Sequence, residues 1–168
     1  GWHYREEFDG SKHTQFLAAI ESVDIGTGII LEALGEELSS RTNVWFFGDN
    51  GTPDKMLRLP PKQGKGSLRE SGVRIPFIVK GPGVKDPGRR ASEFAHLMDV
   101  LPTLATQAGV EPPEGIAGRD LGSVLAGEDW PEERDSLLWE TFSPDGAYHG
   151  RQSWFRSYSD GEYKLIDR

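Results

Sequence analysis

The sequence contains no cysteine, which excludes disulfides, thiolate metal sites and cysteine nucleophiles. The redox compartment is therefore undetermined, and the sequence assigns no localisation. No apolar run approaches the roughly 18 residues of a membrane span. Basic residues are few: 19 Lys and Arg stand against 27 Asp and Glu, for a net charge of −8. This balance argues against nucleic acid or an anionic membrane as the main partner, although a local lysine or metal can still bind a small anion.

The chain has the length of one domain, or of one piece of a larger one. Its 168 residues are 36% hydrophobic and 27% charged, which is typical of a folded chain with a buried core. It begins Gly1-Trp2-His3 without an initiator methionine. We therefore expect it to be a piece of a longer polypeptide, or a processed chain.

The first half of the chain predicts one long helix followed by two strands. Apolar residues between Ser11 and Leu38 recur at spacings of three and four, the pattern of an amphipathic helix. Short apolar runs over 43–48 and 73–80 predict two buried strands. Between them, residues 49–70 are rich in Gly, Pro, Lys and Arg, and a loop of this length is either functional or disordered.

The second half predicts short helices and then an antiparallel end. Asp99 is expected to cap a helix that Gly109 ends, and Asp120 to cap a shorter one. The Asp160-Gly161 pair predicts a type I′ hairpin turn. Three short strands are expected over 137–141, 154–158 and 162–166.

Asp49 and Asn50 follow the first predicted strand and lie between Gly48 and Gly51. Carboxylate and amide oxygens are the ligands that Ca²⁺ and Mg²⁺ prefer, and glycines let the backbone turn sharply around an ion. The same Asp-Asn-Gly sequence is also an ordinary turn. The residues alone leave both interpretations open.

Lys65 lies between Gly64 and Gly66, so neither neighbour has a side chain to block the approach of a bound oxyanion. A lysine near a metal-bound sulfate or phosphate can stabilise the charge that develops on the leaving oxygen. Lys55 and Lys62 lie in the same loop, and each of the three lysines is equally consistent with a solvated surface residue.

The four histidines are scattered, and none has a partner at metal-ligand spacing. His149 lies in a predicted loop and is the candidate substrate-side histidine. His96 has apolar neighbours and is expected in the core or in a position that supports a site.

Several motifs, taken in order, resemble the carboxyl-terminal half of a sulfatase, within the alkaline phosphatase-like superfamily. The motifs are Gly48-Asp49-Asn50-Gly51, residues 64–76, Gly81-Pro82-Gly83, residues 96–104, residues 108–113 with 118–121, and residues 161–166. The resemblance implies an α/β fold, the C-terminal part of an alkaline phosphatase-like sandwich whose mixed sheet is flanked by helices. It assigns 1–127 to the core domain and 128–168 to the start of a small antiparallel subdomain.

The resemblance also implies a reaction, the metal-assisted hydrolysis of a sulfate ester as in arylsulfatases. Asp49 and Asn50 would bind a divalent cation, usually Ca²⁺, and Lys65 would contact the sulfate and assist departure of the alcohol. The family nucleophile is a formylglycine made from a Cys/Ser-x-Pro/Ala-x-Arg segment, and these 168 residues contain no such segment. We therefore expect a fragment that is inactive alone, with its formylglycine in an N-terminal half.

Two other functions stay open. One is hydrolysis of phosphate or phosphonate esters within the same superfamily, although such members often have Asp-His where this chain has Asp49-Asn50. The other is a non-catalytic sulfatase-like module. In either case an open sheet edge invites pairing, so the expected partner is the missing N-terminal half or a second copy of the chain.

Overall fold

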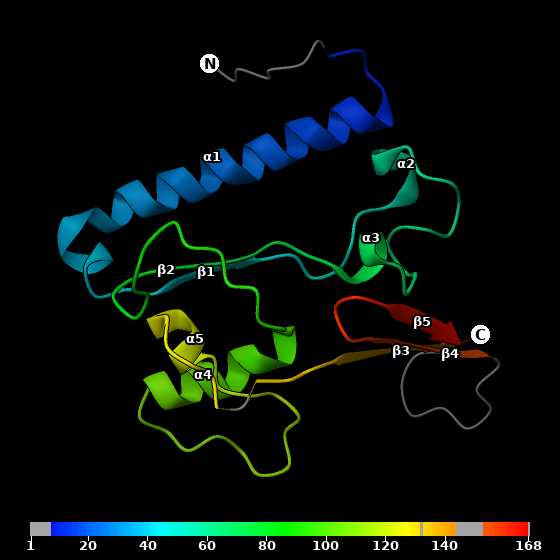
Figure 1. Cartoon of the computed structure of the whole chain (residues 1–168). Helices are drawn as coiled ribbons and strands as arrows, with labels where there is room; N and C mark the ends of the chain where they lie inside the picture. Colours follow the sequence, from blue (N-terminus) through cyan, green and yellow to red (C-terminus); the bar gives the residue numbers. More distant parts are fainter. Residues whose placement is uncertain (1–7, 132, 144–152, 168) are drawn as a thin grey trace. The chain divides into compact units, whose positions relative to one another are not determined.

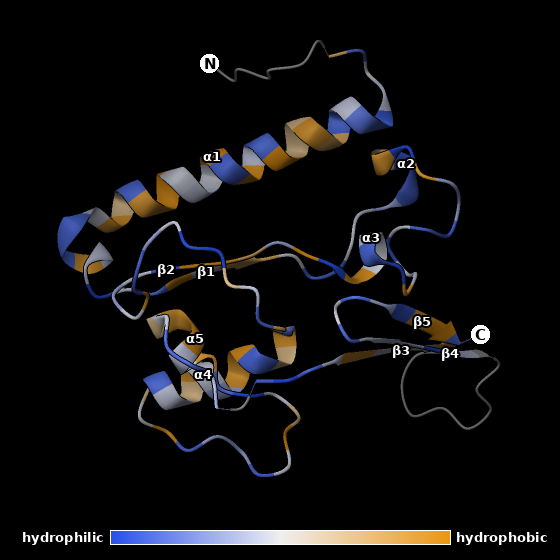
Figure 2. Ribbon diagram, in the orientation of Figure 1, coloured by the Kyte–Doolittle hydropathy of each residue, from blue (hydrophilic) through white to orange (hydrophobic). Residues whose placement is uncertain are grey.

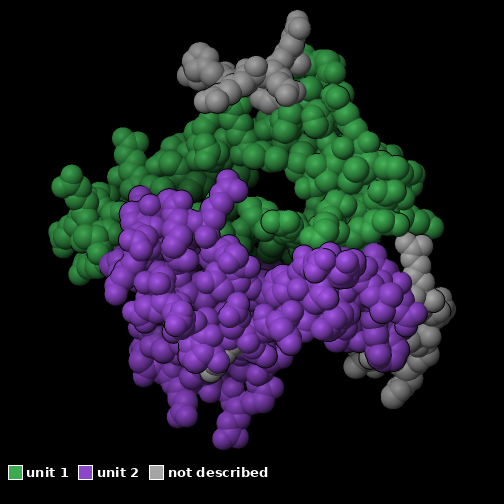
Figure 3. Space-filling view, viewed as in Figure 1, with its two compact units in different colours: residues 1–42, 46–78 green, residues 43–45, 79–168 purple. Residues whose placement is uncertain are grey.

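The computed structural model describes residues 8–131, 133–143 and 153–167 of the chain. The chain divides into two compact units, coloured separately in Figure 3. Unit 1 comprises Gly1–Thr42 and Phe46–Ile78, and unit 2 comprises Asn43–Trp45 and Val79–Arg168. The predicted division of family domains at residue 127 stays a prediction.

The first predicted helix is present as α1, Lys12–Ser39, the long helix in Figure 1, but it is kinked at Gly35, whose φ of 64° and ψ of 177° are not helical. Ser11 caps it, because Thr14 N donates to Ser11 Oγ at 3.2 Å and so satisfies one of the free N–H groups of the first turn. Thr14 is the buried residue of this helix. The apolar positions, orange along α1 in Figure 2, are exposed, with Ile20 at 49%, Val23 at 53% and Ile30 at 65%.

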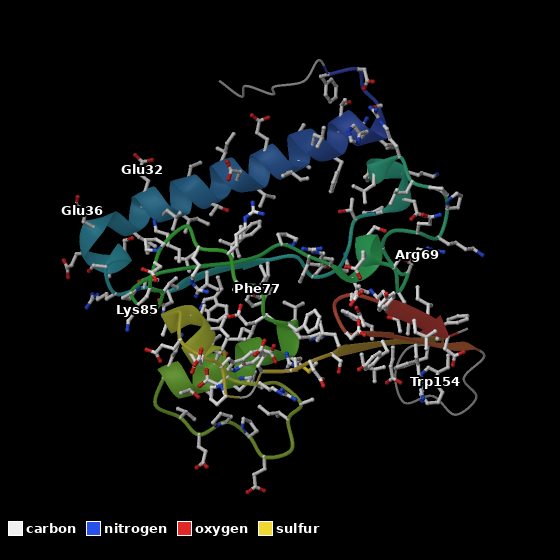
Figure 4. The ribbon with its side chains drawn as sticks, in the orientation of Figure 1. Glu32, Glu36, Arg69, Phe77, Lys85 and Trp154 are labelled. Atoms are coloured by element: carbon white, nitrogen blue, oxygen red, sulfur yellow. The ribbon has the colours of Figure 1, made fainter. Side chains whose placement is uncertain are left out.

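The first predicted strand is confirmed as β1, Val44–Phe47, which pairs with β2, Phe77–Lys80, in a two-stranded sheet. Phe77, labelled in Figure 4, stacks on Phe47 with 5.8 Å between ring centroids. The prediction that both strands are buried is wrong in this structure: Phe46 is 36% exposed, Phe47 41% and Ile78 58%. Two strands alone offer too little surface to bury a face of the sheet.

The second predicted strand begins later than expected. Glu70–Val73 form a helical turn, α3, in which Arg74 N donates to Glu70 O at 2.7 Å. Gly72 is packed so closely that an added Cβ would lie 2.2 Å from the Ser67 carbonyl oxygen. Extending the chain here would break these contacts, so β2 starts only after Pro76. The intervening loop carries one further short helix, α2, Asp54–Leu57.

Unit 2 contains a capped helical segment made of η1, Leu97–Asp99, and α4, Val100–Gln107. Asp99 is the N-cap residue of α4, as predicted, but its side chain makes no cap bond to that helix. His96 caps η1 instead: its Nδ1 accepts from Met98 N at 3.2 Å, while Asp99 Oδ2 accepts from His96 N at 2.7 Å. The two residues form a reciprocal capping box.

Asp99 is also the centre of the core of unit 2. Its carboxylate, 0% exposed, accepts two hydrogen bonds from the guanidinium of Arg134 at 2.6 and 2.7 Å. Arg119 N donates to Asp99 Oδ1 at 2.9 Å, and Arg134 also donates to Phe94 O at 3.0 Å. A buried ion pair is tolerated when its remaining hydrogen-bonding positions are satisfied in this way.

A second short helix lies against this core: α5, Gly122–Ala126, which contributes the buried Val124 and Leu125. The predicted cap by Asp120 is wrong, because Leu121 is the N-cap residue of α5 and no described side chain caps this helix. Asp120 Oδ1 accepts from Gly122 N at 2.8 Å in the turn that leads into it.

The three predicted C-terminal strands are confirmed as an antiparallel sheet in the order β3, β4, β5. Their bounds are Leu137–Ser143, Ser153–Ser159 and Lys164–Asp167. The hairpin after Ser159 is present, with Gly161 at a φ of 92°. The type I′ prediction is wrong, since that turn needs positive φ at both central residues and Asp160 is not among the described residues that have it.

The mixture of helices with small sheets fits the predicted α/β class. Within the described ranges, no helix combines the length and apolarity that crossing a membrane requires.

Candidate functional site

The turn after β1 is held by backbone hydrogen bonds to the segment that precedes β2. Gly48 N donates to Pro76 O at 3.2 Å, and Gly51 N donates to Gly72 O at 2.9 Å. Gly51 is buried, and a Cβ on it would lie 2.1 Å from the Ser71 carbonyl oxygen. Only glycine fits this close approach of two backbones. The turn that carries Asp49 and Asn50 is therefore fixed at both ends.

Asp49 and Asn50 are both exposed. Within the described residues, the Asp49 carboxylate has no hydrogen-bond or ion-pair partner. Asn50 Nδ2 donates to Gly51 O at 3.1 Å, which leaves the amide oxygen of Asn50 as the atom available to a ligand. A carboxylate and an amide oxygen are donors that suit a hard cation. These two oxygens supply only part of such a site. Among the described residues, no three or more His, Cys, Asp or Glu side chains are grouped so that they could hold a metal ion.

Lys65 is bound to this same turn through its backbone. Lys65 N donates to Thr52 O at 2.8 Å. The preceding Gly64 is buried, and a Cβ there would lie 2.2 Å from the same Thr52 oxygen. The side chain of Lys65 is exposed and makes no ion pair with a described residue. Of the three loop lysines, Lys65 is the one whose backbone bonds to the turn carrying Asp49.

The loop before α3 is built around the carbonyl of Gln63. Ser67 Oγ donates to Gln63 O at 2.9 Å, and Ser71 Oγ donates to the same oxygen. Arg69, labelled in Figure 4 beside α3, is the N-cap residue of that helix. These bonds explain why a segment so rich in glycine and proline adopts one conformation.

Asp54 is a residue of this site that sequence reasoning missed. Its carboxylate accepts hydrogen bonds from the backbone N–H groups of Lys62 at 2.6 Å and Gln63 at 3.0 Å, and from that of Gly64. These bonds, that from Gly64 foremost, lower the pKa of Asp54 below its ordinary value. Its partners lie eight to ten residues away in a loop, where no periodic pattern reveals them.

The two candidate histidines have different outcomes. His149 lies outside the described residues, so its role stays a prediction. His96 belongs to the capping box of unit 2, and burial is the main reason that its pKa is lowered from 6.5. This agrees with the expected core position.

Two family profiles match the chain. The profile Sulfatase matches residues 3–110, and the profile described as N-sulphoglucosamine sulphohydrolase, C-terminal, matches residues 64–167. Steryl-sulfatase from Mus musculus is 36% identical over 141 residues, which are 76% of this chain and 23% of that protein. A sulfatase from Formosa agariphila is 33% identical over 93% of this chain and 34% of its own length. The chain thus spans between about a quarter and a third of these curated relatives.

Solved structures show the same fold. The phosphonate monoester hydrolase SpPMH from Silicibacter pomeroyi superposes with a TM-score of 0.79 over 92% of this chain and 32% of that chain. Its sequence identity is 22%, so this likeness establishes the fold and says nothing of the substrate.

Proposed function

Because the chain belongs to the sulfatase family of the alkaline phosphatase-like superfamily, we propose that it forms part of an active site that hydrolyses sulfate esters. Family membership also confirms the predicted fold class, the C-terminal part of an alkaline phosphatase-like α/β fold. One observation carries the functional proposal. The bond from Lys65 N to Thr52 O joins the lysine to the turn of Asp49 and Asn50, while the side chains of Asp49 and Lys65 stay exposed.

In this proposal the Asp49 carboxylate and the Asn50 amide oxygen hold a divalent cation, Ca²⁺. When bound, the cation supplies Lewis-acid polarisation of the sulfate oxygens. Ca²⁺ takes about six to eight oxygen ligands, so the other ligands come from water and from polypeptide outside these 168 residues.

Lys65 supplies positive charge at the ester oxygen. Its ammonium group donates hydrogen bonds to the sulfate and stabilises the negative charge that grows on the oxygen of the departing alcohol. A Cβ on Gly66 would meet nothing within 4 Å, so the space beside this residue leaves room for an ester next to the lysine. His149 is the proposed substrate-side histidine of the complete enzyme.

The nucleophile of this reaction is proposed to lie on other polypeptide. The 168 residues contain no cysteine and no Ser-x-Pro/Ala-x-Arg segment from which formylglycine could be made. The proposed partner is accordingly the N-terminal half of a sulfatase, which would also cover the exposed side chains of β1 and β2.

Turnover of an aryl sulfate tests the proposal. The purified 168-residue chain should show none, whereas the polypeptide that joins it to a formylglycine-bearing half should hydrolyse the ester and lose activity on chelation of divalent metal. Asp49→Ala should abolish the response to added Ca²⁺. Asp24→Ala, which removes an exposed carboxylate from α1, is the matched control and should leave the response unchanged. Robust metal-dependent turnover by the chain alone would sink the proposal that its site is incomplete.

The same joined protein separates the alternatives. An aryl phosphate represents the alternative of phosphate or phosphonate ester hydrolysis within the same superfamily, and a higher kcat/KM for it than for the aryl sulfate would reverse the assignment. Titration calorimetry of the isolated chain with Ca²⁺ addresses the non-catalytic module: we expect weak binding, and tight binding would mean that the site is complete.

The proposed partner is tested by sedimentation. Exposed aromatic and aliphatic side chains on a two-stranded sheet favour pairing with further strands. We expect the isolated chain to self-associate and to become a defined complex when the N-terminal half is supplied. A chain that sediments as a monomer and does not bind the N-terminal half would contradict the proposal.

A further inference from the structure

Asp54 lies at the point where two stretches of the loop meet. Its two carboxylate oxygens accept from three successive backbone N–H groups, those of Lys62, Gln63 and Gly64. Oxygens occupied in this way are turned toward the protein backbone. Asp54 therefore differs from Asp49, whose carboxylate has no partner among the described residues.

The last of these three donors, Gly64, immediately precedes Lys65. A Cβ on Gly64 would lie 2.2 Å from Thr52 O and 2.8 Å from Asp54 N, so the two stretches touch through their backbones. The next residue, Lys65, donates its own N–H to Thr52 O at 2.8 Å. Any movement of residues 62–64 away from Asp54 would thus carry Lys65 away from the turn that holds Asp49.

The loop needs this anchor because its conformation is unfavourable. Lys62 has a φ of 64°, in the left-handed region that is unfavourable for a residue with a Cβ. Few apolar contacts oppose that cost, since Lys62 is exposed and Gln63 only half-buried. The charge-assisted bonds to Asp54 hold the N–H side of this turn, while Ser67 and Ser71 hold the carbonyl of Gln63.

We propose that Asp54 positions Lys65: its carboxylate holds residues 62–64 so that the ammonium group of Lys65 meets the ester oxygen of a sulfate ester at the cation that Asp49 and Asn50 would hold. Asp54 is a positioning residue, because its oxygens are used by the backbone and do not reach the substrate. This inference rests on the proposed function through the role of Lys65.

The kinetic test is a double-mutant cycle in the formylglycine-bearing protein. Asp54→Ala should lower kcat by about 10²-fold, the usual cost of misplacing a group by about 1 Å. It should also make kcat/KM depend more steeply on the pKa of the leaving phenol, as Lys65→Ala does. In a Lys65→Ala background, Asp54→Ala should cause no further loss. Equal losses in both backgrounds, or an unchanged leaving-group dependence, would overturn the proposal.

Two further variants guard against a folding artefact. Asp54→Asn keeps the shape and one acceptor oxygen, so its kcat should lie between those of the wild type and Asp54→Ala. Asp160→Ala is the matched control, because Asp160 likewise accepts backbone N–H groups, from Glu162 and Tyr163, but in unit 2. It should leave kcat and the leaving-group dependence unchanged.

Amide hydrogen exchange in the 168-residue chain gives a readout independent of turnover. Asp54→Ala should speed exchange at the amides of residues 62–65, including that of Lys65, and leave β3, β4 and β5 protected. Unchanged exchange at Lys65 would overturn the positioning role even if the enzyme is active. A wild-type protein without turnover would refute the proposed function, while the exchange result would still decide whether Asp54 positions Lys65.

Discussion

The two units differ in where their key charged side chains lie: those of unit 2 are buried and paired, and those of unit 1 are exposed. In unit 2, Asp99 and Arg134 are 0% and 8% exposed and are held together by two hydrogen bonds. In unit 1, Asp49 and Lys65 are exposed and have no side-chain partner among the described residues, although the backbone around them is tightly fixed. Charges of the first kind stabilise a fold. Charges of the second kind are available to a ligand.

The largest effect is expected from breaking the buried pair. Arg134→Met leaves the Asp99 carboxylate buried without its cation, which should cost about 3–5 kcal/mol in the free energy of unfolding. Urea unfolding at neutral pH measures this loss. The double variant Asp99→Asn with Arg134→Met removes both charges and should recover much of it. A loss below about 1 kcal/mol for the single variant would show that the pair contributes no more than a surface ion pair.

Removing the exposed side chain of Lys65 should affect catalysis strongly and stability very little. Lys65→Ala should lower kcat for an aryl sulfate by about 10²–10³-fold, the range found when a donor to a developing oxyanion is removed. The free energy of unfolding should change by less than about 0.5 kcal/mol, because the side chain is exposed. Lys55→Ala in the same loop is the control and should leave kcat unchanged. A large change in stability would place Lys65 with the structural charges of unit 2.

The local elements of the fold were predictable because their signals are local. The spacing of apolar residues located α1, and alternation with turn residues located β3, β4 and β5. The signals failed where tertiary contacts decide. The strand predicted over 73–80 starts four residues too early, because Val73 belongs to the helical turn α3 and β2 begins at Phe77. The burial of β1 was overestimated because an apolar run reveals nothing about which surface covers it.

The candidate site was predictable only in its residue types. Asp49, Asn50 and Lys65 could be selected from the family resemblance, but the bond that joins Lys65 to Thr52 is invisible in the sequence. Asp54 was missed for the same reason, and so was the pairing of Asp99 with a residue 35 positions away. Long-range partners of charged side chains depend on the fold, not on spacing.

Backbone packing at the site gives a third, smaller effect. Gly64→Ala would place a Cβ 2.2 Å from Thr52 O, a backbone atom with little freedom to move. Such overpacking costs about 1–3 kcal/mol in the free energy of unfolding, and it should reduce kcat as well by displacing Lys65. Gly26→Ala is the control, since a Cβ there meets nothing within 4 Å. That substitution in α1 should stabilise the chain by up to about 1 kcal/mol.

The smallest expected effect is on the pH dependence of the stability of unit 2, through His96. Burial lowers the pKa of His96 from its ordinary 6.5; the nearby Asp99 opposes this shift, while Arg134 adds to it. Below pH 6.5 the unfolded chain therefore binds more protons at this residue than the folded chain. The stability that neutral His96 contributes is complete above that pH and is lost as the pH falls. His96→Asn keeps a capping side chain and should flatten the pH dependence of unfolding of unit 2. An identical pH dependence of the free energy of unfolding for wild type and His96→Asn would show that His96 is solvated and lies outside the core of unit 2.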